Sequence, residues 1–220
     1  MLSEAITGLF RKYRHGLALL MAVPVSLWFW LLEQVNKVPK YTMLSPLDSI
    51  IPFKEIFIIP YFIWYFYIAG SLAFLFFKSP EGFVRLCWLM YGGMALACFV
   101  YTLFPNGQHL RPYVSENDFL SRIVRYTYTV DTPTNSAPSI HVMNSIAVHC
   151  ALINYRGFRA RFHPVKVLSF LLMALICAST VFVKQHSIID VFCGIALSAL
   201  LYLIVYRRDI LTGVPCRAES

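Results

Sequence analysis

The feature that most constrains this chain is a series of six apolar runs, each long enough to cross a bilayer as a helix. They cover residues 17–35, 56–77, 83–104, 138–155, 165–184 and 186–206. About 20 apolar residues span the hydrocarbon core of a membrane. We therefore predict an all-α polytopic membrane protein, a bundle of six transmembrane helices that forms one domain over residues 1–220.

The charge content supports a bilayer as the solvent. Only 14% of the residues are charged, whereas 58% are hydrophobic, and soluble domains carry about 25% charged residues. The net charge of +8 is divided among short clusters between the apolar runs, which argues against a nucleic-acid partner. The six cysteines lie mostly inside the apolar runs without paired spacing, so we interpret them as small core residues rather than disulfides or metal ligands.

The basic residues predict the orientation. With the N-terminus in the cytoplasm, 12 of the 19 Lys and Arg residues fall on the cytoplasmic side. The positive-inside rule then places both termini in the cytoplasm, with tails at 1–16 and 207–220. The first apolar run ends in bulky residues from Leu27 to Leu32, so we expect an uncleaved span instead of a signal peptide. This size, with no cleavable leader or retention signal, suggests the plasma membrane of a bacterium, the inner membrane.

Three polar clusters lie at the ends of apolar runs. The fourth and sixth runs both enter the membrane from the outer side, so their starts face the same compartment as the polar stretch 105–137. The clusters are 106–112 after the third run, 135–141 at the start of the fourth, and 184–190 at the start of the sixth. The predicted topology therefore gathers all three at the outer membrane face.

His186 and Asp190 are four residues apart and so share one face of a helix. A carboxylate at this depth needs a partner, and a bond to one imidazole nitrogen of His186 leaves the other free as nucleophile or base. A His–Asp pair that merely caps a helix is the alternative reading.

Ser139 and His141 follow Pro138, which suits the first turn of a helix. Unsatisfied N–H groups and the helix dipole favour an anion there, although an ordinary capped helix start explains the same residues. Arg111 could bind a phosphate through two N–H groups or simply be a solvated loop arginine. Together, one arginine, two helix starts, two histidines and an aspartate supply the parts for displacement at phosphorus through a phosphohistidine.

The motifs resemble those of the type 2 phosphatidic acid phosphatase superfamily of membrane lipid phosphatases and phosphotransferases. They are Arg111-Pro112, then Pro138-Ser139-Ile140-His141, then Ser179-Thr180 followed by His186 and Asp190. The resemblance covers residues 56–206. It implies that His186 is the nucleophile, that Asp190 orients it and that His141 is the general acid. It also implies that Arg111 and Ser139 bind phosphoryl oxygens, and that neither a metal nor another cofactor takes part.

The chain departs from the family pattern at two cation positions. Phe104 stands where the first motif has lysine, and Thr180 where the third has arginine; Ile140 replaces the glycine of the second motif. We expect that Lys184 replaces one missing cation at the phosphate. Similar losses occur in the branch that resembles inositolphosphotransferases and sphingolipid synthases.

The leading hypothesis is an enzyme that hydrolyses a lipid phosphate or pyrophosphate, with membrane lipids around it. A phosphotransferase that passes a lipid head group to an alcohol is the alternative. A lipid-binding or transport protein without catalysis is the second alternative, but binding alone would not need two histidines and an orienting carboxylate. For His149, deeper in the fourth run, interhelical hydrogen bonding explains its presence as well as catalysis does.

Overall fold

The structure is a computed structural model that describes residues 11–115, 118–158 and 163–211, the last five without side chains. Within these ranges, five helices are long and apolar enough to cross a membrane. They are Arg11–Val35, Glu55–Lys78, Pro80–Leu103, Pro164–Phe182 and Ile188–Tyr206. Each overlaps one predicted run with ends that differ by a few residues, because an apolar run is bounded by the same capping and charged residues that end a helix.

These helices are built from named segments. The first joins η1 (Arg14–Met21) to α2 (Ala22–Val35), and the second joins η2 (Glu55–Phe57) to α4 (Ile58–Lys78). The third contains α5 (Pro80–Cys87), a π-helical turn η3 (Trp88–Gly92) and α6 (Gly93–Leu103). The last two are α9 (Pro164–Phe182) and α10 (Ile188–Leu211).

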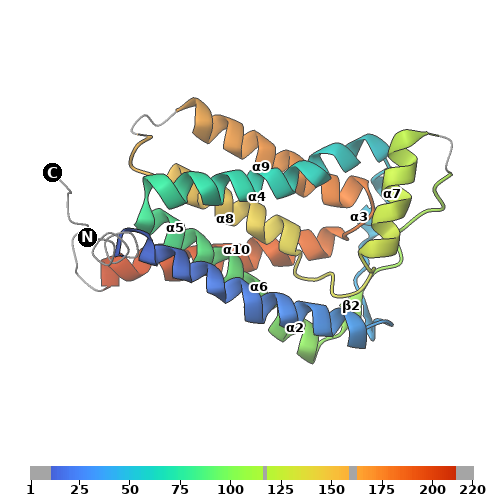
Figure 1. Cartoon of the computed structure of the whole chain (residues 1–220). Coiled ribbons are helices and arrows are strands. Elements are labelled where there is room, and N and C mark those ends of the chain that lie inside the picture. The colour runs from blue at the N-terminus through green and yellow to red at the C-terminus, as the bar shows by residue number, and fades with distance from the viewer. Residues whose placement is uncertain (1–10, 116–117, 159–162, 212–220) are drawn as a thin grey trace, which may run out of the picture.

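The remaining predicted span, 138–155, is a shorter helix. α8 covers Ile140–Ile153, 14 residues, or about 21 Å at 1.5 Å per residue, against roughly 30 Å of hydrocarbon. It packs against α9, α10 and α4, and it lies among these longer helices in Figure 1. The six-helix bundle therefore has one helix enclosed by the others.

The polar connections are more ordered than the sequence indicated. Residues 36–55 contain β1 (Tyr41–Thr42) and the short helix α3 (Pro46–Ile50), and residues 105–137 contain β2 (Asn106–Gly107) and α7 (Phe119–Val130). β1 pairs in parallel with β2, Tyr41 opposite Asn106. Figure 1 shows α3, β2 and α7 gathered across one end of the bundle, so the two connections form a cap there.

The predicted tails lie partly beyond the described residues. Residues 11–16 of the first belong to the N-terminal helix, and 207–211 of the second to α10. Residues 1–10 and 212–220, and with them Arg217, lie outside the described ranges, as do Arg159 and Arg161. The positive-inside argument therefore rests in part on cations that the structure does not describe.

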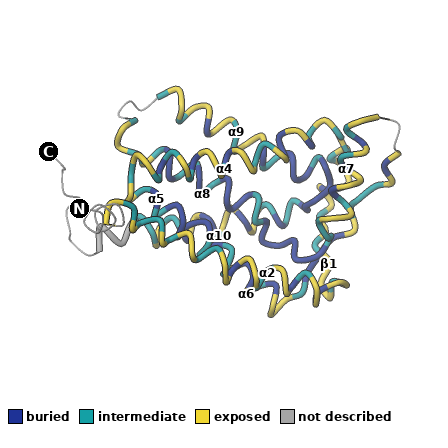
Figure 2. The backbone as a smooth tube through the Cα atoms, viewed as in Figure 1, coloured by how far each residue is buried: buried dark blue, intermediate teal, exposed yellow. Residues whose placement is uncertain are grey.

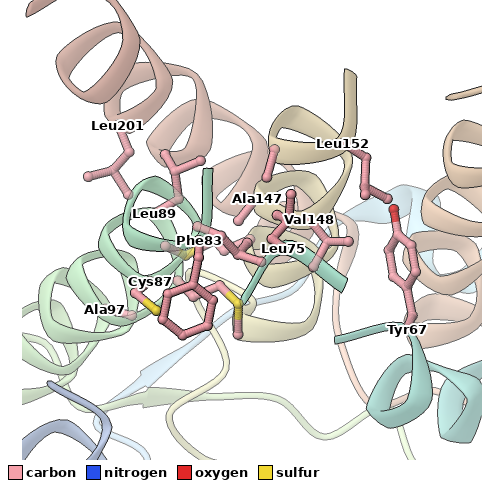
Figure 3. Close-up of a cluster of buried hydrophobic side chains, with 14 of the residues drawn as sticks. Tyr67, Leu75, Phe83, Cys87, Leu89, Ala97, Ala147, Val148, Leu152 and Leu201 are labelled. Atoms are coloured by element: carbon pink, nitrogen blue, oxygen red, sulfur yellow. The ribbon is translucent and has the colours of Figure 1, made fainter. Parts of the chain in front are cut away.

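The core holds the helices together through leucine and other aliphatic side chains, with aromatic and small residues among them. The largest cluster joins the third helix to α4, α8 and α10; labelled members in Figure 3 are Tyr67, Leu75, Phe83, Cys87, Leu89, Ala97, Ala147, Val148, Leu152 and Leu201. Gly93 permits this packing, since a Cβ there would lie 2.9 Å from Met143 Cε and 3.1 Å from Leu201 Cδ1. Figure 2 shows buried backbone on the inward faces and exposed backbone along the outer faces, as expected for a bundle surrounded by lipid.

Candidate active site

His186 lies just before α10 and is paired with Asp190. Its Nδ1 is 3.2 Å from Asp190 Oδ2, which also accepts a hydrogen bond from the backbone N–H of Ser187 at 2.9 Å. Asp190 is fully buried and His186 nearly so. The other imidazole nitrogen, Nε2, makes no hydrogen bond to any residue in the described ranges. The aspartate therefore orients His186 and leaves one nitrogen available for chemistry.

The turn that carries His186 is tight. α9 ends at Phe182, and the N–H groups of Gln185 and His186 both donate to the carbonyl of Thr180. Lys184 has a φ of 55°, a left-handed conformation that is uncommon outside glycine, asparagine and aspartate. Gln108, wholly buried, donates from Nε2 to the carbonyls of Lys184 and Gln185. The cap segments thus fix the backbone leading to the candidate nucleophile.

Asp48, from α3, caps the start of α10. Its Oδ2 accepts from Ser187 Oγ at 2.7 Å, and its Oδ1 accepts from the N–H of Ile188 at 2.8 Å. A carboxylate at a helix N-terminus satisfies free N–H groups and interacts favourably with the helix dipole. Our sequence analysis missed this residue, because its partners are 139 and 140 positions away. The sequence signal for Asp48 is the capping box of α3, in which Ser45 is the N-cap, Pro46 follows and Asp48 is the third helical residue.

His141 lies in the first turn of α8 and faces His186. The two ring centroids are 5.8 Å apart, with the planes tilted by 61°. His141 also packs against the rings of Tyr61 and Trp64 on α4, at 4.5 and 4.3 Å. The structure therefore brings together the two predicted histidines, 45 positions apart in the sequence, between α4, α8 and α10.

Ser139 is the N-cap of α8 and is fully buried. Its N–H donates to the carbonyl of Asp190 at 3.1 Å, which joins the start of α8 directly to α10. The close approach depends on Gly194, where a Cβ would lie 3.1 Å from Ser139 O. Ser139 Oγ itself makes a long contact of 3.5 Å with the N–H of Val142, so this hydroxyl lies at a helix start that can accept an anion.

The segment before α8 is held by Asn106 of β2. Asn106 Oδ1 accepts from the N–H groups of Ser136 and Ala137, and its Nδ2 donates to Ala137 O. Asn135, at a φ of 53°, donates to Glu33 Oε1 and accepts from Asn36. Asparagine adopts this conformation more readily than most residues. The polar residues of the first two clusters therefore shape the loop more than they contact the histidines.

Arg111 lies over the ring of Tyr128, with the guanidinium carbon 4.7 Å from the ring centroid. It donates to the carbonyl of Tyr128 at 3.0 Å and to Oε1 of Gln185. Burial lowers the pKa of Arg111, and the carboxylate of Asp131 opposes that effect. The structure thus places Arg111 next to the residue that precedes His186.

Among the described residues around this site, four buried nitrogen donors have no hydrogen-bond partner. They are Trp64 Nε1, Arg111 Nε, His141 Nε2 and Gln185 Nε2; the histidine nitrogen donates only when it carries a proton. Unpaired buried polar groups are uncommon and costly. The rings of Trp64 and His141 are in contact with their planes tilted by 40°, and Arg111 and Gln185 are hydrogen-bonded to each other next to His186. A group rich in acceptor oxygens, such as a phosphate ester, would satisfy them.

Lys184 differs from its expected placement. Its ammonium donates to the carbonyls of Asp48 and Ile51, at 2.7 and 2.5 Å, and so holds the α3 segment against the turn. Burial lowers the pKa of Lys184, with Asp48 acting in the opposite direction. The expected contact between this ammonium and the phosphate stays a prediction, and it would require Lys184 to release both carbonyls.

The positions at which the family cations are missing are occupied by neutral side chains. Phe104 is 54% exposed at the end of the third helix, and Thr180 is fully buried, with Oγ1 donating to Cys177 O. Neither position supplies a substitute for the missing charge.

Two of the chain's four other histidines, His109 and His149, also lie in or near the segments considered above. His109 is exposed in the cap. His149 Nδ1 is 3.0 Å from Ser169 Oγ, which is 2.6 Å from Tyr67 OH. This chain of hydrogen bonds joins α8, α9 and α4, as expected for interhelical bonding.

The part of the chain described here holds no group of three His, Cys, Asp or Glu residues that could bind a metal ion. Metal independence itself stays a prediction.

The fold and the site together define a bundle of apolar helices with a histidine pair at the starts of two of them. Residues 85–209 match the PAP2 superfamily, and the chain belongs to that family. Members of it are phosphoesterases, so the family supports a phosphatase or phosphotransferase type of function. No curated protein and no solved structure matched the chain.

Proposed function

We propose that this protein cleaves the phosphate ester of a membrane lipid through a phosphohistidine on His186. The observation that carries the proposal is the facing pair His141 and His186, with ring centroids 5.8 Å apart. Asp190 fixes the orientation of one ring, and unpaired buried donors lie around the other. Lipid binding alone would not require this arrangement.

In the proposed first step, Nε2 of His186 attacks the phosphorus atom while the bond to the lipid oxygen breaks. His141 gives that oxygen a proton, which requires its imidazole to be protonated on binding. Arg111, Ser139 and the start of α8 stabilise the phosphoryl oxygens. In the second step a water molecule gives a proton to His141 and attacks phosphorus, which restores His186.

A head-group transferase is the second candidate, and one observation favours it. Asp190 and Ser139 are fully buried and His186 is 8% exposed, so bulk water has little access to these residues. An alcohol bound beside His141 would take the role of water in the second step, with the same proton transfers.

We further propose that the site faces the outside of the cell and that both termini lie in the cytoplasm. In support, Figure 1 shows the start of the first described helix and the end of α10 at one end of the bundle, and the cap at the other end. The plasma membrane of a bacterium remains our proposal for its location.

The test measures phosphohistidine formation and lipid turnover by the purified protein in detergent with EDTA. Lipids labelled with ³²P should leave acid-labile label on the wild type, and none on His186→Ala. His141→Ala should slow turnover by about 10²–10⁴-fold, the usual contribution of a positioned acid. His149→Ala is the matched control, from the same helix but bonded to Ser169, and it should stay within a few-fold of wild type. Equal turnover in all three variants would refute the proposal.

A further inference from the structure

A groove at the end of the bundle away from the cap carries an inference about a second ligand. It has a volume of about 800 Å³ and lies between the start of the first helix and α5, two segments that pack against each other. Figure 1 shows both at the opposite end from α3, β2 and α7. The basic residues that line the groove are Arg11, Lys12, Arg14, His15 and Arg85.

The positive charge in this groove exceeds the negative charge. Glu81 is the acidic residue among the described residues that line it, and its Oε1 is already 2.6 Å from Nη2 of Arg85. Arg11, Lys12 and Arg14 are exposed, and the described part of the chain gives none of them a carboxylate partner. An anion bound in the groove would balance these three cations.

The residues between the cations hold this wall of the groove in place. Tyr13 stacks on Phe76 of α4 with the ring centroids 5.5 Å apart. Nε2 of His15 is 2.9 Å from the carbonyl oxygen of Phe76, and the His15 ring lies 5.6 Å from that of Phe83. Gly16 permits this approach, since a Cβ there would lie 3.0 Å from the Phe76 ring. The basic segment is thus fixed to α4 and α5, which lowers the entropic cost of binding a ligand.

Deeper in the bundle, the walls on both sides become apolar. η1 is a 3₁₀-helix, in which residues three apart are eclipsed. Arg14, Leu17 and Leu20 therefore form one stripe, and the two leucines lie about 6 and 12 Å deeper than the arginine. Both leucines are exposed. On the neighbouring helix, the exposed Trp88 lies four residues beyond Val84, on the same helical face.

We propose that this groove binds an anionic phospholipid, with its phosphate at the cations of the first helix and an acyl chain along the apolar stripe. A free phosphate or an acidic peptide would satisfy the cations, but it would leave Leu17, Leu20 and Trp88 uncovered. With the orientation proposed above, the groove opens toward the cytoplasmic leaflet, whose anionic lipids attract basic segments near the membrane surface. This lipid is a bound ligand and not a substrate, because the groove lies at the opposite end of the bundle from the cap and the histidine pair.

The experiment measures quenching of Trp88 fluorescence by lipids that carry bromine on an acyl chain, in micelles of a non-ionic detergent. The chain has four tryptophans, so the signal of Trp88 is the difference between the wild type and Trp88→Phe. Brominated phosphatidylglycerol should reach half-maximal quenching at a mole fraction about tenfold lower than brominated phosphatidylcholine with the same chains, as expected for several cations at one anionic head group. Equal mole fractions for the two lipids would overturn the proposal.

A matched pair of charge variants tests the assignment of the cations. Arg11→Gln with Arg14→Gln should reduce the preference for phosphatidylglycerol to about twofold or less. Lys37→Gln with Lys40→Gln removes the same charge from exposed positions at the other end of the bundle and should keep the full preference. The same preference in both double variants would overturn the proposal.

Two measurements on the wild type do not depend on how the variants fold. Raising NaCl from about 0.05 to about 0.5 M should weaken the preference several-fold, because salt screens charges at an open groove. An unchanged preference would contradict binding through the cations. Glycerol phosphate, which has no acyl chain, should displace brominated phosphatidylglycerol no better than NaCl of the same ionic strength. Stronger displacement would show a site for soluble phosphates and overturn the assignment to a lipid.

Discussion

Asp190 has two separate roles at the level of single atoms. Its side chain orients His186 and accepts from the N–H of Ser187, while its backbone carbonyl accepts from Ser139. Only the first role depends on the carboxylate. Substitution of the side chain should therefore impair catalysis more than it changes the position of α8.

Asp190→Asn should lower kcat by about 10²–10⁴-fold with little change in KM, because an amide can present an N–H to Nδ1 and so favour the wrong tautomer. Steady-state kinetics with a turned-over lipid would measure it, with folding checked by thermal unfolding in detergent. A rise in KM alone, with kcat preserved, would contradict the orienting role.

Arg111→Lys should raise KM about tenfold or more. A lysine ammonium cannot reproduce the planar set of donors that reaches both Gln185 and Tyr128 while leaving Nε free. Arg122→Lys, an exposed position on α7, is the control and should leave KM unchanged. If both variants bind substrate equally well, Arg111 has no role at the phosphate.

The start of α10 depends on an element far away in the sequence. Asp48 of α3 caps this helix, and Lys184 donates two hydrogen bonds to backbone carbonyls of the same segment. The two connections that form the cap therefore act as structural supports for the site, and mutations in them should change the position of His186.

Asp48→Ala should destabilise the protein by about 1–3 kcal/mol, since the N–H of Ile188 and the hydroxyl of Ser187 lose their acceptor. Thermal unfolding in detergent would measure the change, together with activity. Ser49→Ala, at the exposed neighbouring position, should be within about 0.5 kcal/mol of wild type. Identical unfolding of the two variants would show that the cap contributes nothing.

Gly107→Ala should also destabilise the cap, because a Cβ at this position would lie 2.5 Å from the backbone oxygen of Pro133. The next residue, Gln108, supports the turn before His186, so activity should fall together with the unfolding temperature. Gly70→Ala provides the control, since a Cβ there meets nothing within 4 Å. An active, equally stable Gly107→Ala would mean that the strand pair is free to shift.

The sequence was sufficient to predict the helices and the faces they share. Hydrophobicity over about 20 residues is a strong local signal, and span parity alone placed His141 and His186 at one end. α7 was not predicted although Leu120, Ile123, Val124 and Thr127 follow a helical period, because its 12 residues are too few and too polar to give the signal of a membrane span. Asp48 and the pairing of Tyr61 with Asp131 could not be predicted, since contacts between distant segments have no local pattern.

For the whole molecule, orientation can be tested with single cysteines in a variant that lacks the native ones. Ser115→Cys lies in the exposed part of the cap, and Arg156→Cys lies in the exposed connection after α8. A membrane-impermeant maleimide should label the first in intact cells and the second only in inverted vesicles. The opposite pattern would reverse the orientation and place the site inside.

The depth of His141 below the end of α4 affects how a lipid must reach the site. His141 contacts Tyr61 and Trp64, three and six residues inside the start of α4, or about 5–9 Å below it. A lipid whose head group is level with the end of α4 must sink by that distance before its phosphorus meets His186. The thickness of the host bilayer sets the starting level of that head group. The rate at which one and the same lipid is turned over should therefore change with membrane thickness, so that the bilayer itself contributes to the activity of the protein.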